Sequence, residues 1–150
     1  MDATWAKRRV TPSDAAEVAA HGDYLDEDSA KRLRYAAWVG SRIDAGTYLG
    51  WLATADGEVV GGAGAVLLDW GPTRANPGGT MARIVNVYTA PGWRGHGIAR
   101  ALLGAVLADC EDHGIREFNL AASADGRRLY SALGFESYPA EMRRRSKPVG

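Results

Sequence analysis

The spacing of apolar residues along the chain predicts its central elements. From residue 97 to residue 113, apolar side chains recur on one face, as at Ile98, Leu102 and Val106, which is typical of an amphipathic helix. The strand predicted just before it, at 81–89, contains a nearly continuous apolar run, which is typical of a central strand buried on both faces. Asn86 interrupts that run and is therefore a notable residue.

Local signals predict the remaining elements. Thr11 followed by Pro12 is typical of a helix start, and this helix is expected to end near Ala20. An Asp-Gly pair at 56–57, between two apolar runs, predicts a hairpin whose glycine-rich second arm indicates close packing or a bulge. The other predicted elements are strands at 5–10, 48–54, 58–68 and 115–121, helices at 27–44 and around 129–133, and a final hairpin of 135–137 with 140–145. One right-handed parallel crossover, with antiparallel pairing elsewhere, makes this a mixed-sheet α/β fold.

Composition narrows the class of protein. The chain has 150 residues, which suits one domain over 1–150, and its formal net charge of zero creates no global field favouring nucleic acid or a membrane. No segment approaches the length of a membrane span, and no metal-ligand spacing occurs. Cys110 is the only cysteine, continues an apolar helix face, and is expected to be a core thiol. With no signal peptide, these features predict a cytoplasmic protein.

A glycine-rich stretch joins the central strand to the amphipathic helix. Glycines at 95 and 97 allow close backbone approach, and the free N–H groups at the helix start favour an anion such as phosphate. The stretch lacks the Gly-Lys-Ser/Thr of a Walker loop and the third glycine of a Rossmann fingerprint. The pattern that remains is R-x-x-G-x-A at 94–99.

A second motif, L-Y-x-x-L-G-F at 129–135, follows in the chain after a predicted helix and strand. The two motifs together resemble those of the GCN5-related N-acetyltransferase (GNAT) superfamily, and the resemblance covers essentially the whole chain. It is closest to small bacterial single-domain members with N-V-Y-T before the loop and Glu-Met near the C-terminus. The resemblance implies a mostly antiparallel sheet with a central parallel strand pair and helices on both faces.

The resemblance also implies acetyl-CoA as co-substrate, without a metal. Its pantetheine arm would contact the central strand, which in the family splays from the next strand at a bulge, and its pyrophosphate would lie on the glycine-rich loop. For His96, plain solvent exposure is an equal alternative. Ser123 stands where members often carry an asparagine that contacts CoA, and serine has a shorter reach. The residues implied to bind the cofactor are Val87, Tyr88, Thr89, Arg94, Gly95, His96, Gly97, Ile98, Ala99, Ser123 and Tyr130.

Catalysis requires a proton acceptor for the amine, an oxyanion site and a proton donor for the leaving thiolate. Tyr130 occupies the position of the family's proton donor, the alternative being a packed aromatic. A backbone N–H at Val87 or Tyr88 would stabilise the oxyanion. The glutamate that many members carry early in the central strand is missing here. Glu141 is the favoured base, Asp69 is an alternative, and Asn86 would orient a water or the amine.

The acceptor is expected to contact Tyr24, Trp38 and Asp69, because acids and aromatics together suit a small cationic amine. His21 and His113, near helix ends, are expected to be surface residues. The predicted function is direct transfer of an acetyl group from acetyl-CoA to a primary amine of a small molecule. The alternatives are a protein or peptide amine as acceptor, or a non-catalytic acyl-CoA-binding regulatory domain. Dimers are common in such families, and this analogy alone suggests a homodimer, because the sequence does not determine the oligomeric state.

Overall fold

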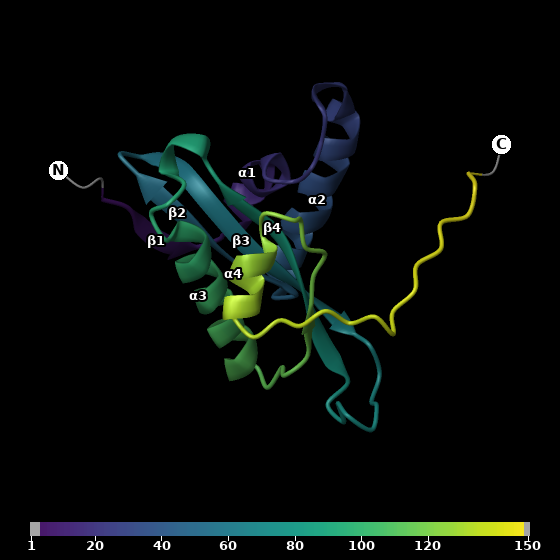
Figure 1. Ribbon diagram of the computed structural model, residues 1–150. Coiled ribbons are helices and arrows are strands. Elements are labelled where there is room, and N and C mark those ends of the chain that lie inside the picture. The colour runs from purple at the N-terminus through teal and green to yellow at the C-terminus, as the bar shows by residue number, and fades with distance from the viewer. Residues whose placement is uncertain (1–3, 149–150) are drawn as a thin grey trace. The chain divides into compact units, whose positions relative to one another are not determined.

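A computed structural model describes residues 4–148, which form two compact units divided after Leu120. The first unit contains a five-stranded sheet in the order β1-β2-β3-β4-β5 (Figure 1). Its strands are β1 (Ala6–Arg9), β2 (Tyr48–Ala55), β3 (Glu58–Asp69), β4 (Thr80–Thr89) and β5 (Phe118–Asn119). Strands β1 to β4 pair antiparallel and β5 pairs parallel with β4, so the prediction of a mixed, mostly antiparallel sheet is confirmed.

Helices cover both faces of this sheet. The helices of the first unit are α1 (Ala15–Ala20), α2 (Ser29–Ala45) and α3 (Ile98–Asp112), with short 3-10 turns η1 (Pro12–Asp14), η2 (Asp26–Asp28) and η3 (Pro91–Trp93). A side chain at Gly61 would meet Ile98 of α3, whereas one at Gly62 would meet His21 at the end of α1. Successive strand residues point to opposite faces, so α1 and α3 lie on opposite sides of β3, as Figure 1 shows.

The predicted hairpin is confirmed. β2 and β3 are joined at Asp56 and Gly57, whose φ angles of 51° and 80° are left-handed. Two successive left-handed residues are what a tight hairpin turn of this kind requires. The glycines of β3 are also explained, since Gly61 and Gly62 leave room for side chains from the two helical layers and Gly64 leaves room for Tyr48 of β2.

The core has two parts. Val18, Val39 and Tyr48 form a buried cluster involving α1, α2 and β2, and the apolar stripe of α3 is buried on the other face of the sheet. Cys110 belongs to that stripe and is fully buried, and burial raises the pKa of its thiol to about 11, so the prediction of a core thiol is confirmed. No helix within residues 4–148 is long and apolar enough to cross a membrane.

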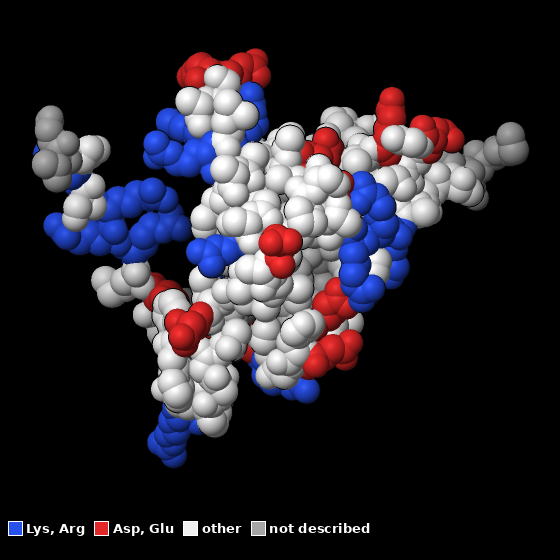
Figure 2. All heavy atoms as spheres, turned by 180° about the vertical axis from the view of Figure 1, so that it is seen from behind, with Lys and Arg blue, Asp and Glu red and all other residues white. Residues whose placement is uncertain are grey.

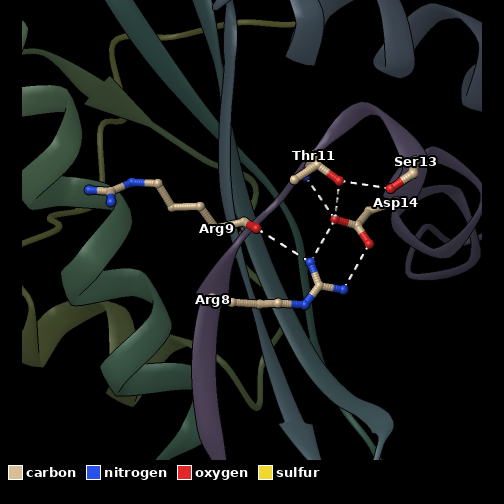
Figure 3. Close-up of polar contacts among 5 residues, drawn as sticks. All are labelled: Arg8, Arg9, Thr11, Ser13 and Asp14. Carbon is tan, nitrogen blue, oxygen red and sulfur yellow. Dashed lines mark hydrogen bonds and ion pairs between the residues drawn. The ribbon is translucent and has the colours of Figure 1, made fainter.

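Two arginines of β1 connect the strand to both helical layers (Figure 3). The Arg8 guanidinium donates to both carboxylate oxygens of Asp14 at 2.8 Å, and the Thr11 N–H donates to the same carboxylate at 2.7 Å. These contacts, led by that with Arg8, lower the pKa of Asp14. Arg9 turns toward α3 and donates to Asp109 at 3.0 Å. Thr11 is the N-cap, as predicted, although the first turn is 3-10 rather than α-helical.

Clusters of charged residues on the surface are small, and both signs of charge occur among them. The 3-10 turn η2 carries acids at Asp26 and Glu27, and Lys31 and Arg34 follow in the first turns of α2. Figure 2 shows a red tip above a blue cluster at the top of the molecule. Neighbouring charges of opposite sign partly cancel, which agrees with the absence of a net charge.

The second unit contains α4 (Arg127–Ala132), followed by Gly134 in a left-handed conformation. From Phe135 to Pro148 the structure contains no strand, so the predicted final hairpin is wrong. The segment is almost entirely exposed and carries Arg143–Arg145, so it has no apolar face with which to form a sheet. The strand predicted at 115–121 is likewise reduced to the two residues of β5.

Candidate active site

The central strand β4 contains a bulge. Gly62 pairs with Tyr88 and Gly64 with Val85, so Asn86 and Val87 lie opposite a single residue of β3. Asn86 has a φ of 57°, a left-handed conformation that asparagine tolerates better than most residues. Bulges of this kind bend a strand and often occur beside functional sites.

β4 also separates from β5. The parallel ladder contains only the pairs Ala82 with Phe118 and Arg83 with Asn119. Beyond Arg83, no strand of the described chain is paired with that edge of β4. Its last residues, Val87, Tyr88 and Thr89, therefore lie at the opening between the two strands. This is the bulged and splayed arrangement that the family resemblance implies.

The side chain of Asn86 is held by two phenols. Its amide nitrogen Nδ2 donates to the Tyr35 hydroxyl at 2.8 Å and to the Tyr48 hydroxyl at 3.1 Å. Tyr48 is buried, and its hydroxyl occupies the space that a side chain at Gly64 would need. Burial raises the pKa of both phenols. Because both stay protonated near neutral pH and an amide does not titrate, this cluster can orient a ligand but cannot act as a base.

A histidine–glutamate pair packs beside the bulge. The His21 ring stacks on Tyr88, with ring centroids 4.5 Å apart, and its Nε2 lies 3.1 Å from the Glu17 carboxylate. Burial lowers the pKa of His21 and outweighs the opposing effect of Glu17, so the ring is neutral near pH 7. The prediction that His21 lies on the surface is wrong, because Gly62 leaves space for its ring against the sheet. His113 is exposed, as predicted.

The glycine-rich loop follows β4 directly. Gly95 and Gly97 adopt left-handed φ angles of 81° and 76°. The first ladder hydrogen bond of α3 runs from Ala101 N–H to the Gly97 carbonyl, so the N–H groups of Ile98, Ala99 and Arg100 precede the ladder. With the positive end of the helix dipole, these groups suit an anion such as a phosphate.

His96 and Arg94 are both exposed in this loop. The ring of His96 packs against Trp93 at 5.2 Å, and its Nδ1 lies 3.0 Å and 3.1 Å from the carbonyl oxygens of Trp93 and Arg94. Nδ1 therefore serves to fix the loop, which leaves Nε2 as the ring nitrogen available to a ligand or water.

The site residues of the second unit have contacts of their own. Tyr130 is half-buried, burial raises the pKa of its phenol, and its ring packs edge-on against Phe135 at 6.1 Å. A protonated phenol can act as a proton donor. Ser123 is exposed and its hydroxyl accepts the Gly126 N–H at 3.2 Å. Glu141 is exposed and follows a turn, whereas the sequence placed it on a strand.

Three aromatic rings form a row that starts at Tyr24, before α2, and continues along that helix with Tyr35 and Trp38. Tyr24 and Tyr35 have ring centroids 6.2 Å apart, and Tyr35 and Trp38 lie 5.5 Å apart. Trp38 lines a cavity of about 520 Å³, and so does Asp69 at the end of β3. The structure thus brings together two of the three predicted acceptor residues and links the third to them through Tyr35.

Sequence reasoning missed three residues around the bulge. Glu17 and His21 are four positions apart on one helix, a spacing that brings side chains together and could have been noticed. Tyr48 had no such signal, because its contact with Asn86 depends on the register of two strand pairs. Within residues 4–148, no three His, Cys, Asp or Glu side chains are grouped as a metal site would require.

Several solved structures share this fold. A predicted acetyltransferase from Clostridium acetobutylicum, crystallised with acetyl-CoA, has a TM-score of 0.85 and 20% identity, covering 95% of this chain and 96% of its own. A GCN5-related N-acetyltransferase from Ralstonia eutropha JMP134 has a TM-score of 0.83 and 26% identity over 97% and 99% of the two chains. The aminoglycoside acetyltransferase AAC(6')-Iy, in complex with a bisubstrate analogue of CoA and acetylneamine, has a TM-score of 0.75 and 18% identity over 97% and 99%.

No curated protein sequence matches the chain. The model of the acetyltransferase (GNAT) family, however, matches residues 14–135, which include the bulged strand, the glycine-rich loop and α4. Most of the chain lies within that match, and the fold agrees with it. The protein is therefore a member of the acetyltransferase (GNAT) family.

Proposed function

We propose that the protein is an N-acetyltransferase that moves an acetyl group from acetyl-CoA to a primary amine of a small molecule, by direct transfer in a ternary complex. The observation that carries the proposal is the bulge of β4, where the strand loses its parallel partner just before a helix start suited to phosphate. Family membership supports the reaction class, since GNAT enzymes transfer acyl groups from acetyl-CoA.

The first unit supplies the binding groups for the donor. Backbone groups of Val87, Tyr88 and Thr89 would pair with the pantetheine arm along the free edge of β4. The loop from Arg94 to Ala99 would hold the pyrophosphate with its backbone N–H groups and the Arg94 guanidinium. Ser123 of the second unit would contact the arm only by giving up or sharing its bond to Gly126.

The reaction forms a carbon–nitrogen bond and breaks the carbon–sulfur bond of the thioester. A backbone N–H of Val87 or Tyr88 would stabilise the oxyanion as it develops. The amine loses one proton and the departing thiolate gains one. Tyr130 would supply the proton to sulfur, because its raised pKa keeps the phenol protonated.

An alkylamine is mostly protonated at neutral pH, and its ammonium form has no lone pair, so it must lose a proton before it can attack the thioester. Asn86 would orient the amine or a water through the side-chain position that Tyr35 and Tyr48 fix. We propose Glu141 as the proton acceptor. Its exposure suits a carboxylate that passes protons to water. Tyr24, Trp38 and Asp69 would contact the rest of the acceptor.

The proposal is tested by measuring free CoA thiol released from acetyl-CoA in the presence of a panel of amines. Replacing the proton donor, in Tyr130→Phe, should lower kcat by about a hundredfold while the Kd of acetyl-CoA, measured by thermal stabilisation, changes little. Tyr138→Phe is the matched control, because Tyr138 is an exposed tyrosine of the same unit. It should behave like the wild type.

Two outcomes would contradict the proposal. If Tyr130→Phe retains the wild-type kcat, Tyr130 is not the proton donor. If acetyl-CoA binds but no small amine releases thiol at any pH, the small-molecule function fails. Release with peptides alone would then favour a protein acceptor, and no release at all would favour a regulatory acyl-CoA-binding domain.

A further inference from the structure

The cavity of about 520 Å³ lies alongside the C-terminal halves of α2 and β3. One wall is formed by Trp38 and Arg42 of α2, and another by residues 66–69, the last of β3. Most of the lining surface is apolar, and the polar residues that line it are Arg42, Thr47, Asp69 and Thr80. That composition is typical of sites for small organic ligands.

Two residues of opposite charge, Arg42 and Asp69, are among those that line this cavity. The Arg42 guanidinium stacks on the Trp38 ring, 5.6 Å from its centroid. The Asp69 carboxylate accepts the Gly71 N–H at 3.2 Å. Within residues 4–148, neither side chain has an ion-pair partner within 4.0 Å. A ligand that carries both charges could therefore form a charge-assisted contact with each.

The cavity is linked to the bulge by the aromatic row. Tyr35 bonds Asn86 through its hydroxyl and contacts Trp38 with its ring. Along β3, Asp69 lies five residues beyond Gly64, a span of about 16 Å at the rise of a strand. A short amine that reacts beside Asn86 would not reach Asp69, whereas an elongated one would lie along the rings.

We propose that this cavity binds the far end of the acceptor, and that the acceptor is an elongated primary amine whose far end is zwitterionic, like that of a free amino acid. The far ammonium pairs with Asp69, the far carboxylate pairs with Arg42, and the chain between packs on Tyr35 and Trp38. This inference rests on the acetyltransferase function proposed above and specifies the substrate class of the same site.

Four acceptors of equal chain length distinguish the effect of the far ammonium from that of the far carboxylate. Each carries a reactive aminohexanoyl group, joined by an amide to pentylamine, to cadaverine, to aminohexanoate or to the side-chain amine of lysine. The far ends are thus uncharged, positive, negative and zwitterionic. Thiol release gives kcat/KM for each, and mass spectrometry identifies the acetylated nitrogen.

The lysine conjugate should have the highest kcat/KM, about tenfold or more above the pentylamine conjugate. Asp69→Asn should lower kcat/KM about three- to tenfold for the two conjugates with a far ammonium and leave the aminohexanoate conjugate unchanged. Arg42→Gln should lower kcat/KM only for the two conjugates with a far carboxylate. Asp44→Asn and Arg34→Gln, exposed changes on α2 outside the cavity lining, should affect none.

Equal kcat/KM for all four conjugates, or equal losses for all four in each variant, would overturn the inference while leaving the acetyltransferase function intact. If no amine releases thiol, the proposed function fails instead. The cavity is then tested by binding. The lysine conjugate should raise the Tm of the wild type and not of Asp69→Asn, and equal shifts would overturn the inference.

Discussion

Gly62 is the position at which the packing of the site can be tested most directly. Replacing it in Gly62→Ala adds a methyl group whose carbon would lie 2.5 Å from Nδ1 and 2.8 Å from Cε1 of His21, and 3.3 Å from Leu52. The His21 ring cannot simply move away, because Tyr88 stacks on it and Glu17 bonds its other nitrogen. Either the ring or the strand must shift.

The expected cost follows from two opposing effects. Overpacking a buried site costs about 1–3 kcal/mol. Replacing glycine restricts the unfolded chain and returns about 0.4–1 kcal/mol. The net loss of unfolding free energy is then about 1–2 kcal/mol. For a chain of this size, each kcal/mol lowers Tm by about 2–4 °C, so Tm should fall by about 2–8 °C.

Urea denaturation followed by circular dichroism measures the loss, and a double-mutant cycle identifies its cause. In the His21→Ala background the new methyl enters space that the ring has vacated, so Gly62→Ala should cost at least about 1 kcal/mol less there. Gly104→Ala is the control, because Gly104 lies in α3 with open space around it, and alanine should stabilise the helix by about 0.5–1 kcal/mol. An equal cost of Gly62→Ala in both backgrounds would refute the packing described for His21.

Three further predictions concern titratable groups. Asp14→Asn should reduce the unfolding free energy at neutral pH by about 1–2 kcal/mol. Because the folded-state pKa of Asp14 is lowered, the difference from wild type should shrink as the pH falls below the unfolded-state pKa of about 3.9. A difference in urea midpoint that stays constant down to low pH would contradict this. Because the pKa of His21 is lowered in the folded state, the unfolded chain takes up the proton more readily, and stability should fall as the pH drops below about 6.5. A His21→Gln variant with the same pH dependence would show that His21 is not the cause. Cys110, whose thiol pKa is raised to about 11, should resist a thiol reagent at neutral pH until urea unfolds the protein, and rapid labelling of the native state would show that the thiol is accessible.

The parts of the fold that the sequence predicts well are those with local causes. The Asp-Gly hairpin depends on two residues with left-handed φ, and the stripe of α3 depends on a helical period, so both could be predicted without knowledge of tertiary contacts. The final hairpin was predicted wrongly from short polar runs around Pro139, which provide no buried face. His21 was misplaced for the opposite reason. Its burial depends on a glycine more than forty residues away, and no local pattern reveals that contact.

The same distinction explains why the sequence carries a motif for the proposed donor side of the site and none for the proposed acceptor side. The glycine-rich loop is proposed to bind through backbone groups, and its glycines are visible in the sequence as a motif. The acceptor side depends on which side chains meet at the bulge, and this is set by Asn86. Its left-handed backbone creates the bulge that frees Val87 and Tyr88, while its amide reaches Tyr35 on α2 and Tyr48 on β2. Glycine would permit the same φ but could not bond the two phenols. Asparagine at this position therefore connects the strand edge proposed for the donor with the aromatic row proposed for the acceptor.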